Sequence, residues 1–277
     1  MKTIFKNILK EASNNNLIWT LLKPTYNGLQ FMSYQRELSD QEDIQASIKG
    51  KYFQSLNVQS GPFEGLKYAS FEAFGSTLYP KLVGSYEKEL EPALKEMLND
   101  SYSEVINIGC AEGYYAVGFA LKNRTAKVYA YDIEDKAREL CQEMAEINGV
   151  SDRVFIDGEF TPDSLSTFNF TKKGLILCDC EGYEKQLFTQ ETIKNLHNCD
   201  LIIEAHDYRD ISISPYLKEL FEKTHEIESV YSFDDIQKTH FYEFDLLQDA
   251  SLEEKKIIFA ESRPAIMEWL ICRAKEK

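Results

Sequence analysis

The chain has 277 residues, 43% of them hydrophobic and 28% charged, which is the composition of an ordinary folded protein with enough length to bury a full core. Its formal net charge of −15 makes nucleic acid a poor partner, because an acidic surface repels a phosphate backbone. No apolar run approaches the length of a membrane span, and residues 1–23 lack the apolar core of a signal peptide, so we expect a cytoplasmic protein without a transmembrane segment.

The cysteines give no sign of a metal centre or of a disulfide framework. Most of the six lie inside apolar runs, where Cys behaves as a small hydrophobic residue. Cys178 and Cys180 are separated by one residue, and the chain has no second pair at zinc-ligand spacing. We therefore expect reduced thiols, as in the cytoplasm.

The first part of the chain shows weak periodicity. Helices are predicted near residues 2–12 and 40–50, and a turn before Leu66–Ser70 favours a short strand there. We expect residues 1–80 to form a mainly helical N-terminal extension that would cap an acceptor site, and residues 81–277 to form the main domain.

From residue 84 onward the pattern becomes regular. Residues 84–100 carry apolar side chains at four-residue spacing, which predicts a helix with one apolar stripe. Strand-like apolar runs then alternate with helical stretches, which favours parallel strands joined by crossovers in a doubly wound α/β sheet. Residues 232–251 are long for a loop and are interpreted as a flap or an insertion with its own helix. The predicted strands are 105–108, 127–131, 153–156, 175–178, 201–204, 226–230 and 266–272, and the predicted helices are 114–122, 135–147, 184–195, 213–222 and 252–261.

Polar residues follow the predicted strands at one edge of this sheet, which is where open α/β sheets bind ligands. The first strand runs into a loop with Gly109 and Gly113. A dinucleotide-binding loop needs glycine where this chain has Ala111. The acid-x-Gly-x-Gly-x-Gly loop of S-adenosylmethionine-dependent methyltransferases is matched better, with Asn107 at the acid position and Ala111 at the middle glycine. The loop therefore favours S-adenosylmethionine over a dinucleotide.

An acidic residue, Asp132, ends the second strand. A carboxylate at this place can accept both hydroxyl hydrogens of an adenosine ribose. The alternative is a cap for the helix predicted over 135–147, and we favour the ribose role because Asp132 lies early for a cap. The predicted donor-binding residues are Asn107, Gly109, Cys110, Ala111, Glu112, Gly113, Asp132, Ile133, Gly158, Glu159 and Asp179.

Three later segments resemble the FkbM-type methyltransferase family. "LILCDCEGYEKQLF" is similar to that family's Asp-x-Glu-Gly-x-Glu signature, carried here by Asp179, Glu181, Gly182 and Glu184, while "LIIEAHDY" and "AIMEWLICRA" resemble its fifth and closing strands. The resemblance implies a class I methyltransferase fold, which is a Rossmann-like α/β sheet of order 3-2-1-4-5-7-6 with the last strand antiparallel. It also implies S-adenosylmethionine as donor, S-adenosylhomocysteine as product, and a hydroxyl acceptor on a sugar, glycan or secondary metabolite.

Two residues are candidates for catalysis. Asp179 would lie beside the methionine part of the donor, and His206, after the fifth strand, is the candidate general base because imidazole titrates near neutral pH. A hydrogen-bonded structural histidine is the equal alternative for His206, and the other three histidines are interpreted as structural. We predict no metal ion. Mg²⁺ held by Asp179, Glu204, His206 and Asp207 is the less favoured alternative.

Competing functions lack their motifs. A nucleic-acid amine methyltransferase would carry Asn/Asp-Pro-Pro-Tyr/Phe where this chain has Asp179-Cys180-Glu181-Gly182, and a cytosine C5 enzyme would need a Pro-Cys pair. A protein that binds the donor without catalysis, as a regulator or scaffold, stays open as the second function. The expected partner is a small-molecule or glycan acceptor, and the sequence does not predict an oligomeric state.

Overall fold

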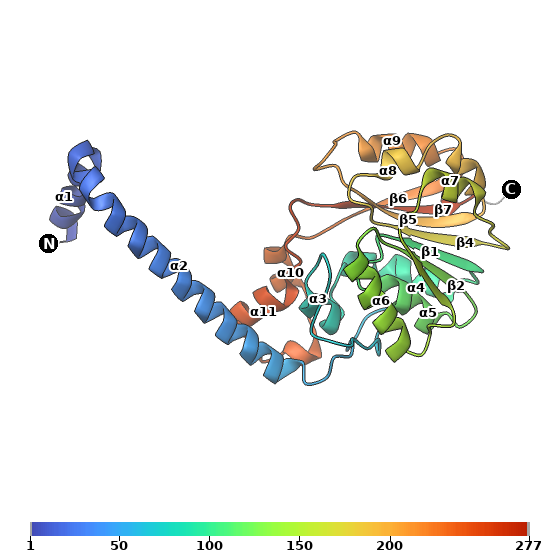
Figure 1. Cartoon of the computed structure of the whole chain (residues 1–277), viewed down its shortest axis with the longest axis horizontal. Coiled ribbons are helices and arrows are strands. Elements are labelled where there is room, and N and C mark those ends of the chain that lie inside the picture. The colour runs from blue at the N-terminus through green and yellow to red at the C-terminus, as the bar shows by residue number, and fades with distance from the viewer. Residues whose placement is uncertain (1, 276–277) are drawn as a thin grey trace. The chain divides into compact units, whose positions relative to one another are not determined.

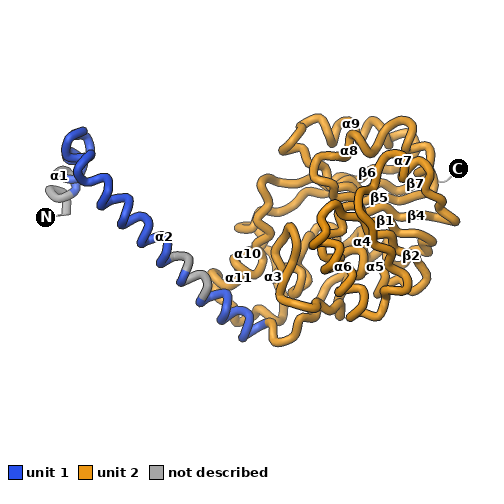
Figure 2. Tube along the Cα trace, in the orientation of Figure 1, with its two compact units in different colours: residues 1–52 blue, residues 53–277 orange. Residues whose placement is uncertain are grey.

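The computed structural model describes residues 2–275, with the backbone but not the side chains of residues 2–5, 7–8, 37–38 and 40–42. The chain divides into two compact units, Met1–Tyr52 and Phe53–Lys277 (Figure 2). Residues 53–80, which the sequence assigns to the extension, therefore pack with the second unit.

The first unit consists of two helices, α1 (Lys2–Asn14) and α2 (Asn16–Tyr52). The helix predicted near residues 2–12 is confirmed, whereas the one predicted near 40–50 is only the end of a helix of 37 residues. The first half of α2 was not predicted as helix, because its apolar residues are exposed and do not form the one-sided stripe that marks a helix packed on a core. Within the described residues, no helix combines the length and the hydropathy needed to cross a membrane.

The second unit is built on a seven-stranded sheet of order β3-β2-β1-β4-β5-β7-β6 (Figure 1). Strands β1 to β5 are parallel to one another, and β7 runs antiparallel to both β5 and β6. This order and these directions confirm the predicted class I methyltransferase fold. The strands are β1 (Glu104–Ile108), β2 (Lys127–Tyr131), β3 (Val154–Asp157), β4 (Gly174–Cys178), β5 (Cys199–Ala205), β6 (His225–Tyr231) and β7 (Glu268–Ala274).

Helices cover both faces of the sheet, which explains why its central strands are apolar throughout. Every residue of β1, β4 and β5 is buried. Figure 1 shows α5 and α6 on one face and α8 and α9 on the other. The main helices of this unit are α3 (Leu78–Val83), α4 (Glu91–Asn99), α5 (Tyr114–Lys122), α6 (Asp135–Ile147), α7 (Pro162–Thr167), α8 (Glu184–Leu187), α9 (Ile213–Phe221), α10 (Asp235–Phe241) and α11 (Leu252–Phe259).

Three predicted elements differ in the structure. The strand expected at Leu66–Ser70 is reduced to one isolated bridge between Asn57 and Lys67. The helix expected over 84–100 begins only after a 3₁₀ turn at Lys88–Leu90. The helix expected over 184–195 is split into α8 and a 3₁₀ turn at Thr192–Asn195. The Thr192 hydroxyl accepts a hydrogen bond from the Thr189 amide and donates one to the Leu187 carbonyl, and these bonds replace helical ones at the split.

The late insertion has the helix of its own that the sequence predicts. Residues 232–251 contain α10, whose N-terminus is closed by a capping box between Asp234 and Gln237, and a short 3₁₀ turn, Asp245–Leu247. The insertion packs on α11, which immediately follows it in the chain.

Candidate functional site

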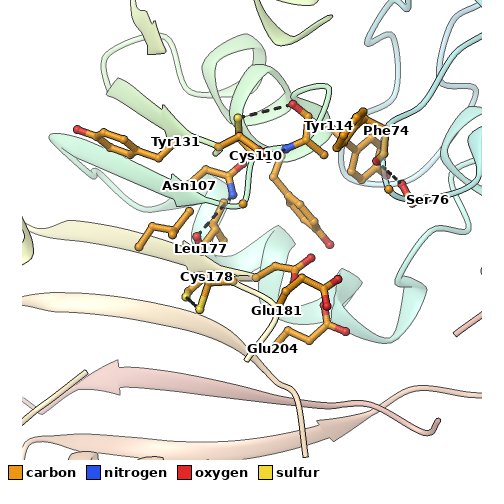
Figure 3. A pocket seen from close by; sticks show the side chains of 18 of the residues that line it. Phe74, Ser76, Asn107, Cys110, Tyr114, Tyr131, Leu177, Cys178, Glu181 and Glu204 are labelled. Carbon is orange, nitrogen blue, oxygen red and sulfur yellow. Dashed lines mark hydrogen bonds between the residues drawn. The ribbon is translucent and has the colours of Figure 1, made fainter. Parts of the chain in front are cut away.

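A cavity of about 500 Å³ opens at the carboxyl ends of β1, β2 and β4, where the sequence predicts a ligand site (Figure 3). Its walls come from the loops after these strands, from residues 74–76 and from residues 86–90. Of the predicted donor-binding residues, those that line it are Asn107, Gly109, Cys110, Ala111, Asp132, Ile133, Gly158, Glu159 and Asp179.

The two glycines of the first loop serve close packing. Gly109 has φ +76°, and a Cβ atom there would lie 1.8 Å from the backbone oxygen of Asp179. The Asp179 amide in turn donates to the Ile108 carbonyl at 2.9 Å, so the loops after β1 and β4 cross at this glycine. Gly113 does not line the cavity. It has φ +100°, and a Cβ atom would meet the Cys141 sulfur at 2.8 Å, so it lets α5 pack on α6.

Asp132 fixes the shape of the same loop. Its Oδ2 accepts a hydrogen bond from the Ala111 amide at 2.9 Å, and its Oδ1 accepts one from the Glu134 amide at 3.0 Å. Ala111 has φ +47°, a left-handed conformation that costs about 1 kcal/mol or more without glycine. The N-cap of α6 is Glu134, so Asp132 does not occupy the capping position weighed as its alternative role. Each carboxylate oxygen can accept a further hydrogen bond, and Asp132 lines the cavity.

Asn107 supplies an unmatched acceptor in the cavity wall. Its side chain is buried, and its amide nitrogen donates a long hydrogen bond of 3.5 Å to the Leu177 carbonyl (Figure 3). Its Oδ1 is buried and has no hydrogen-bond partner within the part of the chain that the structure describes. An orphaned acceptor of this kind fits a ligand that brings a hydrogen-bond donor, such as the ammonium group of a methionine moiety.

An apolar edge borders the cavity beside Asp132. The side chain of Ile133 is 73% exposed although it is large and apolar. Tyr131 is half-buried and packs on Phe160, with the ring centroids 4.6 Å apart. Gly158 and Glu159 form the facing loop. A flat aromatic ligand would find apolar cover at this edge.

Glu112 lies beneath the loop and does not line the cavity. It is 1% exposed and forms an ion pair with the buried Lys81. Its carboxylate also accepts hydrogen bonds from the Tyr68 hydroxyl and from the Phe74 amide, both at 3.1 Å. Since Phe74 lines the cavity, Glu112 connects the glycine loop to the segment that closes it.

Several aromatic residues line the cavity that the sequence did not point to. Tyr114 and Tyr115 form the first turn of α5, directly after the glycine loop, and that position was a usable signal. Tyr86 looked like part of an apolar helical stripe, but it precedes the helix. Burial and the nearby Glu87 raise the pKa values of Tyr86 and Tyr115 well above their ordinary range. Phe74 and Trp269 carried no local signal, because only the fold brings them there.

A second, smaller pocket of about 110 Å³ adjoins the first and shares Asp179 and Glu181 with it. His206 lines only this second pocket and is 2% exposed. Its Nε2 lies 3.3 Å from Asp179 Oδ1 and 3.8 Å from Glu181 Oε2, while its Nδ1 bonds to the fully buried Glu184. Burial alone would lower the pKa of His206, but the carboxylates of Asp179 and Glu184 raise it to about 11. The imidazole is thus protonated at neutral pH, whereas the predicted role of general base requires the neutral form.

The other two residues of the less favoured Mg²⁺ alternative bind other side chains, although Glu204 lines both pockets. Glu204 binds Arg263 at 2.5 Å, and burial and the charge of Asp179 raise the pKa of Glu204 well above its usual range. Asp207 accepts hydrogen bonds from the amide and the hydroxyl of Ser214 and so holds the start of α9. Glu181, which was not part of that alternative, lies near Asp179 and His206. The remaining histidines are 197, 225 and 240, and none of them lines either pocket.

Comparisons with known proteins give likeness in fold only. No protein-family model matches the chain, and no curated protein matches it in sequence. Among solved structures, cofactor-bound Rv0187 from MTB is similar at 12% identity with a TM-score of 0.46, over 72% of this chain and 95% of that one. A SAM-dependent methyltransferase from Geobacter sulfurreducens in complex with S-adenosyl-L-homocysteine is similar at 15% identity with a TM-score of 0.41, over 67% and 89%.

A precorrin-6y C5,15-methyltransferase from Geobacter metallireducens is similar at 11% identity with a TM-score of 0.42, over 65% of this chain and 85% of that one. At these identities and TM-scores the likenesses carry no conclusion about activity. The fold rests on the order and directions of the seven strands, which are those of a class I methyltransferase.

Proposed function

We propose that the protein is an S-adenosylmethionine-dependent methyltransferase that methylates a hydroxyl group of a sugar, glycan or secondary metabolite. We also infer that it is a member of the FkbM-type family, on the basis of the Asp-x-Glu-Gly-x-Glu signature at Asp179–Glu184. The acceptor class follows from that family resemblance.

One observation carries the proposal of a methyl donor. The cavity has an unmatched acceptor, Asn107 Oδ1, on one side and a carboxylate, Asp132, at the end of the neighbouring strand. The first can accept from the ammonium group of the donor and the second from its ribose hydroxyls. Ile133, next to Asp132, belongs to the apolar edge of the cavity. If Asp132 binds the ribose, this edge would cover the adenine attached to it. The cavity volume of about 500 Å³ lies within the usual range for sites of such ligands.

The second pocket supports a transfer reaction. It shares Asp179 and Glu181 with the donor cavity, so an acceptor held there would approach the donor next to these carboxylates. Bound S-adenosylmethionine supplies an electrophilic methyl carbon and retains the electrons of the broken carbon–sulfur bond as neutral S-adenosylhomocysteine. The acceptor oxygen forms the new bond to carbon and must lose its proton. Asp179 reaches both pockets and is our candidate to receive that proton, with the charged His206 beside it.

The donor site is tested by isothermal titration of the full chain with S-adenosylhomocysteine. Asp132→Asn should weaken binding about tenfold because it removes the charge-assisted bonds to the ribose. Asp135→Asn is a matched control, since this exposed residue on the same segment pairs only with Arg138 among the described interactions. Equal affinity in the two variants would contradict the ribose role.

The transfer reaction is tested by S-adenosylhomocysteine release in the presence of glycan and hydroxylated-metabolite panels. We expect release that depends on an acceptor and on Asp179. Donor binding without release for any acceptor would favour the second function, a regulator or scaffold that binds the donor. The role of residues 1–80 as an acceptor-binding cap is part of the same proposal, and a chain lacking residues 1–52 should keep donor binding while its acceptor affinity falls.

A further inference from the structure

The second pocket contains a cluster of ligand-type atoms that the proposed reaction leaves unexplained. Asp179, Glu181 and His206 each offer one such atom, and these atoms lie within 4.8 Å of one another. The two carboxylates come from the loop after β4 and the imidazole from the residue that follows β5. We propose that this cluster is a binding site for a divalent transition-metal cation, with Asp179 Oδ1, Glu181 Oε2 and His206 Nε2 as its ligands.

The histidine is oriented as a metal ligand would be. Its ring is 2% exposed, and Nδ1 is engaged by Glu184, whose side chain is fully buried. This contact fixes the ring and leaves Nε2 as the atom that faces Asp179 and Glu181. A carboxylate on the far nitrogen is the usual support of a metal-bound histidine, because it selects the tautomer and raises the basicity of the ligating nitrogen.

One oxygen of the carboxylate opposite the histidine lacks a hydrogen-bond partner, although the Asp179 side chain as a whole is 45% exposed. Asp179 Oδ1 is shielded from solvent, yet it has no hydrogen bond of normal geometry among the described residues. Its separation of 3.3 Å from Nε2 leaves the two atoms adjacent but poorly aligned. A shielded carboxylate oxygen without a donor is costly, and a cation between the two atoms would satisfy it.

The charges around the cluster also favour a cation. Asp179, Glu181 and Glu184 bring three carboxylates, and the side-chain cation paired with them is Arg209, at 2.6 Å from Glu181. Arg263 also lines the pocket, but it forms ion pairs with Glu87, Glu204 and Glu261. Of the two negative charges that remain, a proton on His206 balances one, whereas a divalent metal ion in its place would balance both.

The ligand set points to the class of metal. Two carboxylate oxygens and one imidazole nitrogen suit Mn²⁺, Fe²⁺ or Zn²⁺ better than Mg²⁺, which prefers oxygen ligands throughout. Three protein ligands leave coordination positions open toward the pocket. If the proposed methyl transfer holds, a cation here would draw electron density from the acceptor hydroxyl and so ease the loss of its proton to Asp179.

Binding of Mn²⁺ to the full chain tests the site directly. The six-line electron paramagnetic resonance signal of free Mn²⁺ should decrease when the protein is added, by an amount that corresponds to one bound ion per chain. Isothermal titration should give the same stoichiometry. Asp179→Asn and His206→Gln should each weaken binding about tenfold or more, and Glu184→Gln should weaken it by a comparable factor through the orientation of His206. Asp207→Asn is the control, because Asp207 is adjacent to His206 in sequence but binds Ser214. It should leave Mn²⁺ affinity unchanged.

The outcomes separate this site from the proposed function. Titration with S-adenosylhomocysteine in the absence of Mn²⁺ reports the donor cavity alone, and thermal melting of each variant reports folding. Absence of Mn²⁺ binding at millimolar concentration, or equal binding by wild type, Asp179→Asn and His206→Gln, would overturn the metal site while intact donor binding left the methyltransferase proposal standing. Loss of Mn²⁺ binding in folded Asp179→Asn and His206→Gln, with Asp207→Asn unchanged, supports the site whatever the acceptor proves to be.

Discussion

The carboxylate of Glu112 accepts a hydrogen bond from the backbone amide of Phe74 at 3.1 Å, across 38 residues of sequence. The same carboxylate holds the ammonium group of Lys81, which is 2% exposed. The loop that would bind the donor and the segment that closes the cavity are therefore joined through one buried ion pair.

Glu112→Gln should lower both stability and donor affinity. The variant leaves Lys81 buried without its counter-charge, which costs about 3 kcal/mol, and it loosens the segment that carries Phe74. Chemical denaturation measures the first effect and titration with S-adenosylhomocysteine the second. Lys81→Met in the Glu112→Gln background should restore part of the stability, because no buried charge is then left unpaired. A further loss in that double variant would contradict this account.

Asn107→Leu should separate donor affinity from stability. The Oδ1 atom of Asn107 has no partner among the described residues, and the Nδ2 bond is long at 3.5 Å, so the folded protein loses little. The affinity for S-adenosylhomocysteine should fall about tenfold, the size expected for a lost hydrogen bond to a charged group. An unchanged dissociation constant with an unchanged melting temperature would show that Asn107 does not contact the donor.

Two glycines in the cavity wall should respond differently to the same substitution. Gly109→Ala places a methyl group 1.8 Å from the Asp179 carbonyl oxygen and should destabilise the fold by about 3 kcal/mol or more. A Cβ atom at Gly158 meets nothing within 4 Å, so Gly158→Ala should fold normally. Urea denaturation of both variants makes the comparison. Similar stabilities would mean that the loops after β1 and β4 do not cross as described.

The pH dependence of stability should carry the signature of His206. Its carboxylate neighbours raise its pKa in the folded protein to about 11, whereas an unfolded histidine titrates near 6.5. Between these values the unfolded chain releases a proton that the folded chain keeps. The stabilisation is therefore full below about pH 6.5 and declines as the pH rises toward 11. Without added metal, the free energy of unfolding should fall more steeply between pH 7 and 9 in wild type than in His206→Gln. Parallel pH profiles would argue for a neutral imidazole.

Much of the sheet and most of the donor cavity were predictable from local pattern. Buried strands give continuous apolar runs, helices give a spaced stripe, and the strand ends then share one edge, which is how Asn107, Asp132 and Asp179 could be grouped. Residues from distant segments could not be grouped in this way. Phe74 and Trp269 reach the cavity only through tertiary packing, which leaves no mark in the surrounding sequence.

The second pocket shows most clearly what local sequence patterns could not predict. His206 and Asp207 are adjacent in the chain and equally polar, and the sequence treats both as candidate ligands. Successive side chains at the end of a strand point to opposite sides, so one faces the pocket and the other faces α9. Together with Asp179, Glu184 on α8 raises the pKa of His206. The spacing of the Asp-x-Glu-Gly-x-Glu motif does not show that its last residue contacts a histidine after β5.

The contact between Gly109 and the Asp179 carbonyl limits how this protein could be re-engineered. The loop proposed to bind the donor and the loop that carries Asp179 cross at this point, so insertions or deletions after β4 would disturb the loop after β1 at the same time. New acceptor preferences are better sought on the opposite wall, where Pro264 and Met267 line the second pocket but not the first. If the proposed function holds, libraries built there would alter the acceptor and leave donor binding intact.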